Sequence, residues 1–322
     1  MKILANDGIS PSGKEKLEAN GYTVITDKVE QGDLINYINE NNISALLVRS
    51  ATTARKDLID ACPNLKFIGR GGVGMDNIDV AYAKEKGLTV KNTPASSSQS
   101  VAELAMAHLF SLSRGMYDAN RQMPVNGLEK FKDLKKKYGK GIELRGKTIG
   151  IIGFGRIGQS LASYALGLGM NVLFHDTFSG KADIVVSINN KDINISLNSS
   201  SFEEILSQSD FISLHVPKQD GGKAVIGSDE FSKMKDGVII INLARGGVID
   251  ETALISALDS GKVAAAGLDV FENEPTPNEA LLKHPKISLT PHIGAATVEA
   301  QDRIGTELAD LIMEALPLQH EV

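Results

Sequence analysis

Three residues in the second half of the chain carry side chains suited to acid–base catalysis on a polar substrate. Arg245 lies in INLARGG, Glu274 in VFENEP and His292 in LTPHIGA, each shortly after an apolar run typical of a buried strand. A guanidinium presents a planar set of donors to a carboxylate or carbonyl. A histidine transfers protons, and a neighbouring carboxylate favours its charged form. These groups would suit hydride transfer at C2 of a small 2-hydroxy or 2-keto acid, which needs a held carboxylate, a polarised carbonyl and a proton donor.

Each of these residues also has a structural interpretation. Arg245 could be a surface ion-pair partner, Glu274 a solvated turn residue before Pro275, and His292 a capping residue before Gly294. We favour the catalytic interpretation, because ligands of open parallel sheets bind at the carboxyl ends of strands and all three residues follow such strands.

The other histidines lack comparable support. We expect His108, inside an apolar helix, to be a packed core residue, and His215 to be structural or near a cofactor. The remaining three are expected to be exposed or structural: His175, His284 and His320.

Two segments, 69–74 and 153–158, fit the spacing G-x-G-x-x-G, and their context separates them. A dinucleotide site also needs an acid at the end of the next strand to bind the adenosine ribose. The strand NVLFH after the second segment is followed by Asp176, whereas LTVKN after the first is followed by no acid. We therefore place the pyrophosphate at 153–158, against a helix N-terminus. Asp176 would repel a 2′-phosphate, so NAD is favoured over NADP.

The elements that must position these residues alternate between strand and helix. Strands are predicted at 2–5, 22–25, 45–48, 66–68 and 88–90, followed by an apolar helix over 101–112 and a basic, turn-rich stretch over 126–141. Alternation restarts at Lys147 and runs to about Leu289, and 297–316 forms an amphipathic helix. This rhythm predicts an α/β protein with parallel sheets. The expected domains are a Rossmann NAD-binding domain over 98–289 and a smaller, discontinuous, flavodoxin-like substrate (lid) domain made of 1–97 and 290–322.

Composition excludes several classes of protein. A length of 322 residues suggests two domains. A net charge of −6 argues against a nucleic-acid binder. No apolar run approaches the roughly 20 residues that span a bilayer, and the N-terminus does not resemble a secretory signal. Cys62 is the single cysteine, so no internal disulfide or cysteine zinc site is possible. We expect a cytoplasmic protein without a metal.

Seven motifs occur in order along nearly the whole chain: GRGGVGMDNID, SVAEL, RGKTIGIIGFGRIG, HVP, NLARGGVIDE, GLDVFENEP and TPHIGAAT. In this order they resemble the D-2-hydroxyacid dehydrogenase family. The resemblance implies that Arg245, Glu274 and His292 are catalytic. It implies cofactor contacts from Val73, Val101, Gly153, Gly155, Arg156, Ile157, Gly158, Asp176, His215, Val216, Pro217, Leu243, Ala244, Arg245, Asp269, His292, Gly294 and Ala295. It implies substrate contacts from Arg49, Ser50, Arg70, Gly72, Val73, Gly74, Arg245 and His292.

Within this family the preferred substrate is predicted to be D-3-phosphoglycerate, oxidised with NAD in serine biosynthesis. The alternative is a glyoxylate or hydroxypyruvate reductase, and an alternative of another class is an NAD-sensing, corepressor-like binding protein. The lysines of 130–140 are either a solvated surface or an attraction for a phosphorylated substrate, completed by a neighbour in a homodimer. The chain ends at Val322, so we expect no appended regulatory domain and no serine feedback through one.

Overall fold

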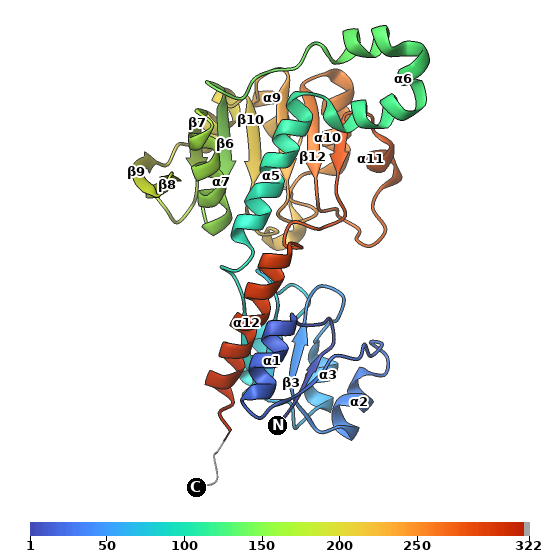
Figure 1. The fold of residues 1–322 in the computed structure, drawn as a ribbon, viewed down its shortest axis with the longest axis vertical. Coiled ribbons are helices and arrows are strands. Elements are labelled where there is room, and N and C mark those ends of the chain that lie inside the picture. Colours follow the sequence, from blue (N-terminus) through green and yellow to red (C-terminus); the bar gives the residue numbers. More distant parts are fainter. Residues whose placement is uncertain (319–322) are drawn as a thin grey trace. The chain divides into compact units, whose positions relative to one another are not determined.

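The computed structural model describes residues 1–318, which divide into two compact units. The first unit joins Met1–Ser100 to the segment that begins at Ala295, and the second is Val101–Gly294. Each unit contains one parallel sheet with helices against it (Figure 1). The predicted α/β fold class is confirmed.

The first unit contains a five-stranded sheet of order β2-β1-β3-β4-β5. All neighbouring strands are parallel. Gly13 and Gly305 allow two helices of this unit to pack closely, because a Cβ on Gly13 would lie 2.5 Å from the Gly305 carbonyl carbon. The strands are β1 (Lys2–Ala5), β2 (Thr23–Ile25), β3 (Ile43–Val48), β4 (Phe67–Arg70) and β5 (Thr89–Asn92), and the helices are α1 (Pro11–Ala19), α2 (Leu34–Glu40), α3 (Lys56–Ala61), α4 (Val80–Glu85) and α12 (Val298–Ala315).

The second unit contains a six-stranded parallel sheet of order β13-β12-β11-β10-β6-β7. Its central strands are buried along their whole length, as expected for a sheet covered on both faces. The strands are β6 (Thr148–Ile152), β7 (Asn171–His175), β10 (Phe211–Leu214), β11 (Val238–Asn242), β12 (Val263–Leu268) and β13 (Ile287–Leu289). The helices are α5 (Ser98–Ser113, which begins in the first unit), α6 (Met116–Tyr138), α7 (Arg156–Gly167), α8 (Phe202–Gln208), α9 (Ser228–Lys233), α10 (Glu251–Ser260) and α11 (Glu279–Lys283), with a short 3-10 turn at Asp220–Gly222.

The prediction of a turn-rich stretch over 126–141 is wrong, because α6 continues to Tyr138. Pro124 lies inside the helix, and the backbone departs from helical angles only at Lys130. The lysines and the leucine beyond the kink are good helix formers, and that leucine, Leu134, is buried. Lysines in the last turn also complement the helix dipole.

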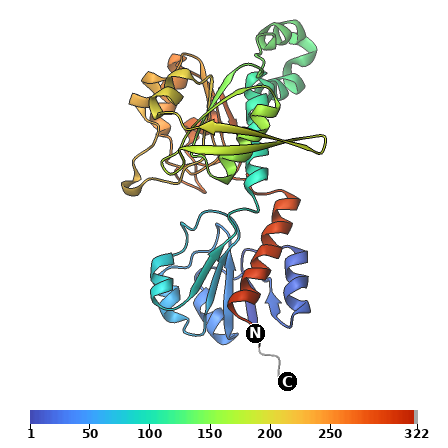
Figure 2. The same cartoon turned by 90° about the vertical axis from the view of Figure 1, so that its left-hand side faces the viewer.

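An antiparallel hairpin, β8 (Lys181–Ile188) and β9 (Lys191–Asn198), was not anticipated from the sequence. It projects from the second unit (Figure 2). Asn189 and Asn190 both have positive φ, at 49° and 61°, which suits a two-residue hairpin turn. Ile184 and Val186 are buried on one face. The available sequence signal for this hairpin was the pair of asparagines between two stretches in which polar and apolar residues alternate.

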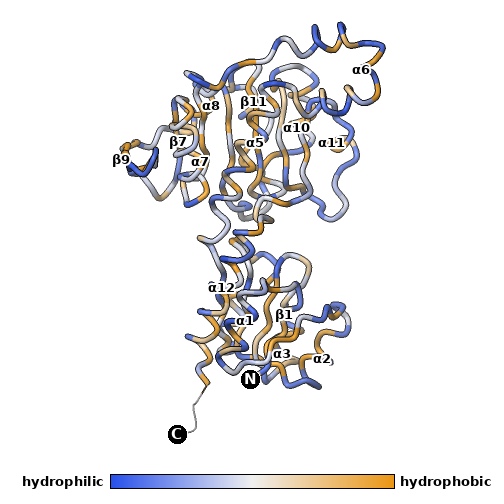
Figure 3. Tube along the Cα trace, viewed as in Figure 1, coloured by the Kyte–Doolittle hydropathy of each residue, from blue (hydrophilic) through white to orange (hydrophobic). Residues whose placement is uncertain are grey.

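Apolar residues concentrate in the strands of both sheets, while α6 mixes polar and apolar positions (Figure 3). Within residues 1–318, none of the helices is both long enough and apolar enough to cross a membrane.

Candidate active site

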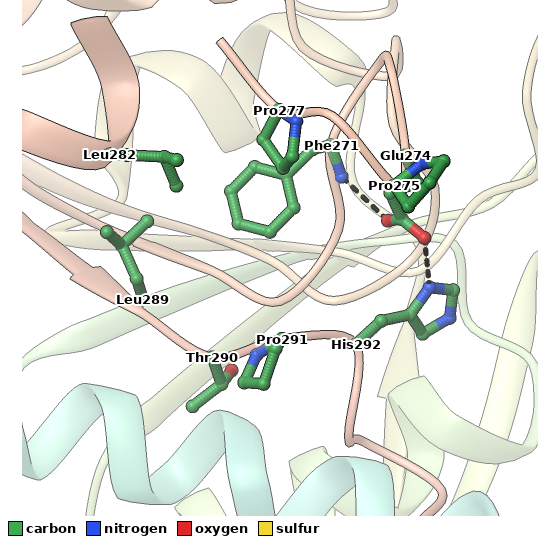
Figure 4. Close-up of a pocket in the computed structure, with 9 residues that line it drawn as sticks. All are labelled: Phe271, Glu274, Pro275, Pro277, Leu282, Leu289, Thr290, Pro291 and His292. Atoms are coloured by element: carbon green, nitrogen blue, oxygen red, sulfur yellow. Dashed lines mark hydrogen bonds and ion pairs between the residues drawn. The ribbon is translucent and has the colours of Figure 1, made fainter. Parts of the chain in front are cut away.

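Glu274 and His292 form a hydrogen-bonded pair in the second unit. His292 Nδ1 lies 2.7 Å from Glu274 Oε2, and Glu274 Oε1 accepts the Phe271 N–H at 3.0 Å (Figure 4). Both side chains are partly exposed, at 40% for His292 and 34% for Glu274. The carboxylate is thus fixed at both oxygens, and it fixes one ring nitrogen. The second ring nitrogen, Nε2, is the one left to meet a substrate.

Asp269 holds the backbone that follows His292. Its Oδ1 accepts the Ile293 N–H at 2.9 Å and its Oδ2 accepts the Gly294 N–H at 2.8 Å. His292 has a φ of +54°, a left-handed conformation that is uncommon for a residue other than glycine. Such a conformation persists only where its surroundings enforce it, and the buried Asp269 supplies that restraint.

Asn242, at the end of β11, shapes the turn that presents Arg245. Its side chain donates to the Arg245 carbonyl at 2.9 Å and accepts the Ala244 N–H at 3.0 Å. Gly246 follows, and a Cβ there would lie 1.9 Å from the Phe271 carbonyl oxygen. The Arg245 turn and the loop that carries Glu274 therefore touch through backbone atoms. Sequence reasoning missed Asn242, although an asparagine at a strand end is a known turn signal.

Glu251, at the start of α10, supports the same loop from behind. Its Oε1 accepts the Glu272 N–H at 2.8 Å. Burial raises the pKa of the Glu251 carboxyl, and the nearby charges of Glu272 and Asp250 add to this, while the Glu272 N–H works against it. This supporting role was also missed, because a glutamate in a first helical turn ordinarily needs no tertiary explanation.

A pocket of about 420 Å³ adjoins the Glu274–His292 pair (Figure 4). It is lined by Phe271, Glu274, Pro275, Pro277, Leu282, Leu289, Thr290, Pro291 and His292. Apart from the pair itself the lining is almost wholly apolar and contains no lysine or arginine. An anionic substrate would find no lysine or arginine partner among the residues that line this pocket.

The segment 153–158 has the geometry of a dinucleotide-binding turn. Gly153 has a φ of +88°, and a Cβ there would lie 2.5 Å from the His215 carbonyl oxygen. A Cβ on Gly158 would lie 2.4 Å from the Gly153 carbonyl oxygen, whereas one on Gly155 would meet no atom within 4 Å. Gly155 therefore faces open space before the first turn of α7, where N–H groups and the helix dipole favour a pyrophosphate. The residues present fit NAD.

Asp176 lies at the end of β7, as the dinucleotide fold requires, and it also closes the glycine turn. Its carboxylate accepts the N–H groups of Phe154 at 2.7 Å, Phe178 at 2.8 Å and Ser179 at 3.1 Å. Burial alone would raise the pKa of Asp176, but these three backbone donors outweigh it and hold the pKa below its ordinary value. Each carboxylate oxygen accepts more than one hydrogen bond, so capacity remains for ribose hydroxyls.

His215 lies beside this turn, since its carbonyl oxygen would be 2.5 Å from a Cβ on Gly153. Its Nε2 lies 2.9 Å from Ser213 Oγ, while Nδ1 is buried without a partner among the described residues. Burial lowers the pKa of His215 to about 4, so the ring is neutral. A buried ring nitrogen without a partner is costly in the unliganded protein and is a natural contact for a bound group.

The remaining predicted cofactor residues fall in both units. The second unit contains Val101, Arg156, Ile157, Val216, Pro217, Leu243, Ala244 and Gly294. Val73 and Ala295 belong to the first unit.

The predicted substrate residues of the first unit gather at the carboxyl ends of β3 and β4. Arg49 and Ser50 follow β3, and Arg70 ends the neighbouring β4. Asp7 braces this edge by accepting the N–H groups of Arg49 at 2.6 Å and Thr52 at 3.0 Å.

Gly72 and Gly74 lie in the loop after β4, on either side of the exposed Val73. A Cβ on Gly72 would lie 1.7 Å from Arg70 Nη1, so the guanidinium folds over this loop. The first unit thus has two guanidinium groups, of Arg49 and Arg70, on adjacent strand ends.

The lysines of 130–140 do not share an edge with the catalytic loops. The start of α6 lies near the beginning of β13, because the Tyr117 hydroxyl donates at 3.0 Å to the carbonyl of Pro285, two residues before that strand. The chain returns from α6 to the start of β6. Both points belong to the amino edge of the sheet, whereas Arg245, Glu274 and His292 follow carboxyl ends. Within one chain these lysines cannot reach the catalytic loops.

The other histidines have structural partners. His175 Nδ1 lies 3.0 Å from the Ser200 carbonyl, and His284 Nε2 lies 3.4 Å from Asp259. His108 is buried, as predicted, but it also makes hydrogen bonds. His320 lies outside the described residues. Among those described, no group of three histidine, cysteine or acidic residues could hold a metal ion.

The fold and the site define a dinucleotide-dependent α/β enzyme with an arginine, a glutamate and a histidine at strand ends. Residues 106–294 match the D-isomer specific 2-hydroxyacid dehydrogenase, NAD binding domain. The matched range includes 153–158 and excludes 69–74. The chain belongs to the D-isomer specific 2-hydroxyacid dehydrogenase family, and it is an NAD-dependent oxidoreductase.

Individual relatives within this family differ in substrate. The chain is 45% identical to a hydroxypyruvate reductase of Thermotoga maritima, covering 94% of this chain and 92% of that protein. It is 39% identical to a D-3-phosphoglycerate dehydrogenase of Archaeoglobus fulgidus, covering 100% of this chain but only 59% of that protein. The crystal structure of a glyoxylate reductase from Paecilomyes thermophila has a TM-score of 0.81 at 30% identity, covering 98% of this chain and 95% of that one.

Proposed function

We propose that this enzyme oxidises D-3-phosphoglycerate to 3-phosphohydroxypyruvate with NAD, as the first step of phosphorylated serine biosynthesis. The observation that carries the chemistry is the 2.7 Å hydrogen bond between His292 and Glu274, which leaves one ring nitrogen for the substrate hydroxyl. A reversible 2-hydroxy acid oxidation needs such a proton acceptor and donor.

Each residue of the site has a defined task in this proposal. Arg245 holds the substrate carboxylate and polarises the C2 oxygen with its planar donors. His292 would take the hydroxyl proton on Nε2 as the C2–H bond breaks, and NAD, when bound, would supply the hydride acceptor. Glu274 stabilises the resulting imidazolium through Nδ1. In the reverse direction the same imidazolium returns the proton to the developing alkoxide.

Support for a phosphorylated substrate comes from the first unit. Arg49 and Arg70 end adjacent strands beside a glycine loop, and guanidinium groups and turn N–H groups are both suited to phosphate. Several relatives, including the Archaeoglobus protein, are named D-3-phosphoglycerate dehydrogenases. We propose that Arg49, Ser50, Arg70 and the 72–74 loop receive the substrate.

Hydroxypyruvate reduction is the second candidate. The relative from Thermotoga is more similar, at 45% identity, and is matched over 92% of its length. The position of the α6 lysines also removes one source of positive charge from the site within a single chain. The catalytic residues would be unchanged, and only the phosphate contacts would lose their purpose.

The deciding experiment compares NADH formation from D-3-phosphoglycerate and from D-glycerate at mildly alkaline pH. A charge-assisted hydrogen bond is worth roughly 1.5–3 kcal/mol, so the phosphorylated acid should have a kcat/KM at least about tenfold higher. A preference for D-glycerate, together with faster reduction of hydroxypyruvate than of its phosphate, would replace this proposal with the second candidate.

We further propose a cytoplasmic homodimer in which α6 contributes to the interface. Val125, Leu128 and Phe131 are exposed on this helix in the single chain. Exposed apolar side chains of this size commonly mark an interface. Sedimentation should give a dimer for the wild type and a shift toward monomer for Leu128→Lys combined with Phe131→Lys. A monomeric wild type would refute the interface.

A further inference from the structure

His108, inside α5, connects that helix to the loop that carries His292. We infer that His108 is a positioning residue, which fixes the catalytic loop through Thr290 and Asp269. This inference rests on the proposed acid–base role of His292, and it concerns residues of the second unit alone.

The ring of His108 occupies a site built to receive it. The residue is 3% exposed. Its Nδ1 lies 3.0 Å from Ser288 Oγ and its Nε2 lies 3.1 Å from Thr290 Oγ1. Gly267 on β12 makes room, because a Cβ there would lie 3.0 Å from the ring. An apolar side chain could fill this space, so the two polar contacts need a separate explanation.

The hydrogen bonds form a chain with one consistent direction. Asp269 accepts from the Ile293 and Gly294 N–H groups, and its Oδ1 accepts the Thr290 hydroxyl at 2.6 Å. Because the Thr290 hydroxyl donates its hydrogen bond to Asp269, Thr290 Oγ1 accepts a hydrogen bond from His108 Nε2–H. The neutral ring then uses Nδ1 to accept the Ser288 hydroxyl. Burial lowers the pKa of His108, only partly opposed by the charge of Asp269, so the neutral ring is favoured.

This chain ends at the backbone that sets the position of His292. Asp269 restrains the two N–H groups after a residue with a left-handed backbone. If His108 no longer donates, the Thr290 hydroxyl can turn away and Asp269 loses one of its three restraints. A shift of His292 would weaken its alignment with the substrate hydroxyl, and a misplacement of about 1 Å can cost about 100-fold in rate.

The test uses variants that separate the two sides of the ring. Glutamine can place a donor near the former Nε2, whereas asparagine reaches only the former Nδ1. We expect His108→Gln to retain most of the wild-type kcat. We expect His108→Asn and Thr290→Val each to lower kcat about tenfold. This loss is smaller than the roughly 100-fold loss that a misplacement of about 1 Å can cause. Ser288→Ala, on the opposite side of the ring, should leave kcat within about twofold, because its bond does not lead to the loop.

Two further measurements distinguish positioning from packing. The double variant His108→Asn/Thr290→Val should be no slower than Thr290→Val alone, because both changes break the same chain. Ser288→Ala and Thr290→Val each remove one buried hydroxyl and should lower the melting temperature similarly, while only Thr290→Val lowers kcat. The inference would be overturned if Ser288→Ala lost as much kcat as Thr290→Val. It would also be overturned if His108→Gln lost as much kcat as His108→Asn.

The assay uses whichever 2-hydroxy acid the wild type oxidises, so a wrong substrate assignment leaves the test intact. His292→Asn is measured in parallel. Full turnover by that variant would overturn the proposed acid–base role and, with it, this inference. An inactive His292→Asn beside an unaffected Thr290→Val would overturn this inference alone.

Discussion

The segment 153–158 in the second unit and the segment 69–74 in the first have the same glycine spacing but different surroundings. In the second unit, added Cβ atoms on Gly153 and Gly158 would strike backbone oxygens. In the first unit, a Cβ on Gly69 would meet the side chains of Leu47 and Phe67, and one on Gly72 would meet the Arg70 guanidinium. The glycines of one loop bring backbone close to backbone, and those of the other make room for side chains.

The elements after the two loops also differ. Gly155 opens directly onto α7, a helix of 12 residues, and Asp176 closes the turn from the next strand. The 69–74 loop is followed by no helix until Val80, and no acid follows β5 directly. A glycine pattern therefore indicates a dinucleotide site only when a helix N-terminus and an acidic strand end accompany it. We interpret the first loop as the one that receives the substrate.

The largest effect is expected at the catalytic pair of the second unit. His292→Asn should lower kcat by about 10²–10⁴-fold, because it removes the proton acceptor. Steady-state NADH formation measures this rate. His284→Asn is the matched control, since His284 is bonded to Asp259 away from the site. A His292 variant that is only as impaired as the control would contradict the assignment.

The next effect separates the two glycine loops by their cofactor affinity. Gly153→Ala should weaken NAD binding by about tenfold or more, because a left-handed alanine costs roughly 1–2 kcal/mol and its Cβ would displace the His215 backbone. Gly87→Ala is the control, because Gly87 also has a positive φ of +85° but its Cβ would meet nothing within 4 Å. Calorimetry with NAD measures both. An equal loss in Gly87→Ala would attribute the effect to general strain.

A smaller effect is expected at the guanidinium groups of the first unit. Arg49→Gln and Arg70→Gln should each raise the KM for D-3-phosphoglycerate about tenfold or more, since a charged hydrogen bond is worth roughly 1.5–3 kcal/mol. The KM for NAD should not change. Arg55→Gln serves as the control, because Arg55 is paired with Asp79 at the start of α3. If D-glycerate and its phosphate were affected alike, these arginines would not be phosphate contacts.

The smallest effect concerns stability and pH at Asp176. Its pKa is lower in the folded protein than in the unfolded chain, so its hydrogen bonds stabilise the fold above the unfolded pKa of about 3.9 and are lost as pH falls through the folded value. Asp176→Asn should therefore be less stable than the wild type near neutral pH, and the difference should shrink below about pH 4. Denaturant unfolding at several pH values measures this. A difference that is constant with pH would show that the carboxylate charge is not responsible.

Much of the fold could be predicted from local pattern. The strand at 2–5 is β1, and β7 is the predicted NVLFH. Apolar runs of this length bounded by turns specify strands of a buried parallel sheet. The prediction for 126–141 was wrong because the helix formers after Lys130 continue α6 to Tyr138. The hairpin of β8 and β9 was overlooked because its strands are largely exposed and lack the continuous apolar run of a buried parallel strand.

The sequence by itself determined the order of motifs, the family and the choice of the second glycine loop, because these depend on residue types at fixed spacings along the chain. It did not determine which neighbours hold each functional group. Three supporting contacts illustrate this: Asn242 with Arg245, Glu251 with Glu272, and Asp269 with the loop after His292. The partners are either far apart in sequence or look like ordinary turn and cap residues. Hydrogen bonds are short and directional, so only the tertiary structure, which brings strand ends and loops together, decides which polar groups meet.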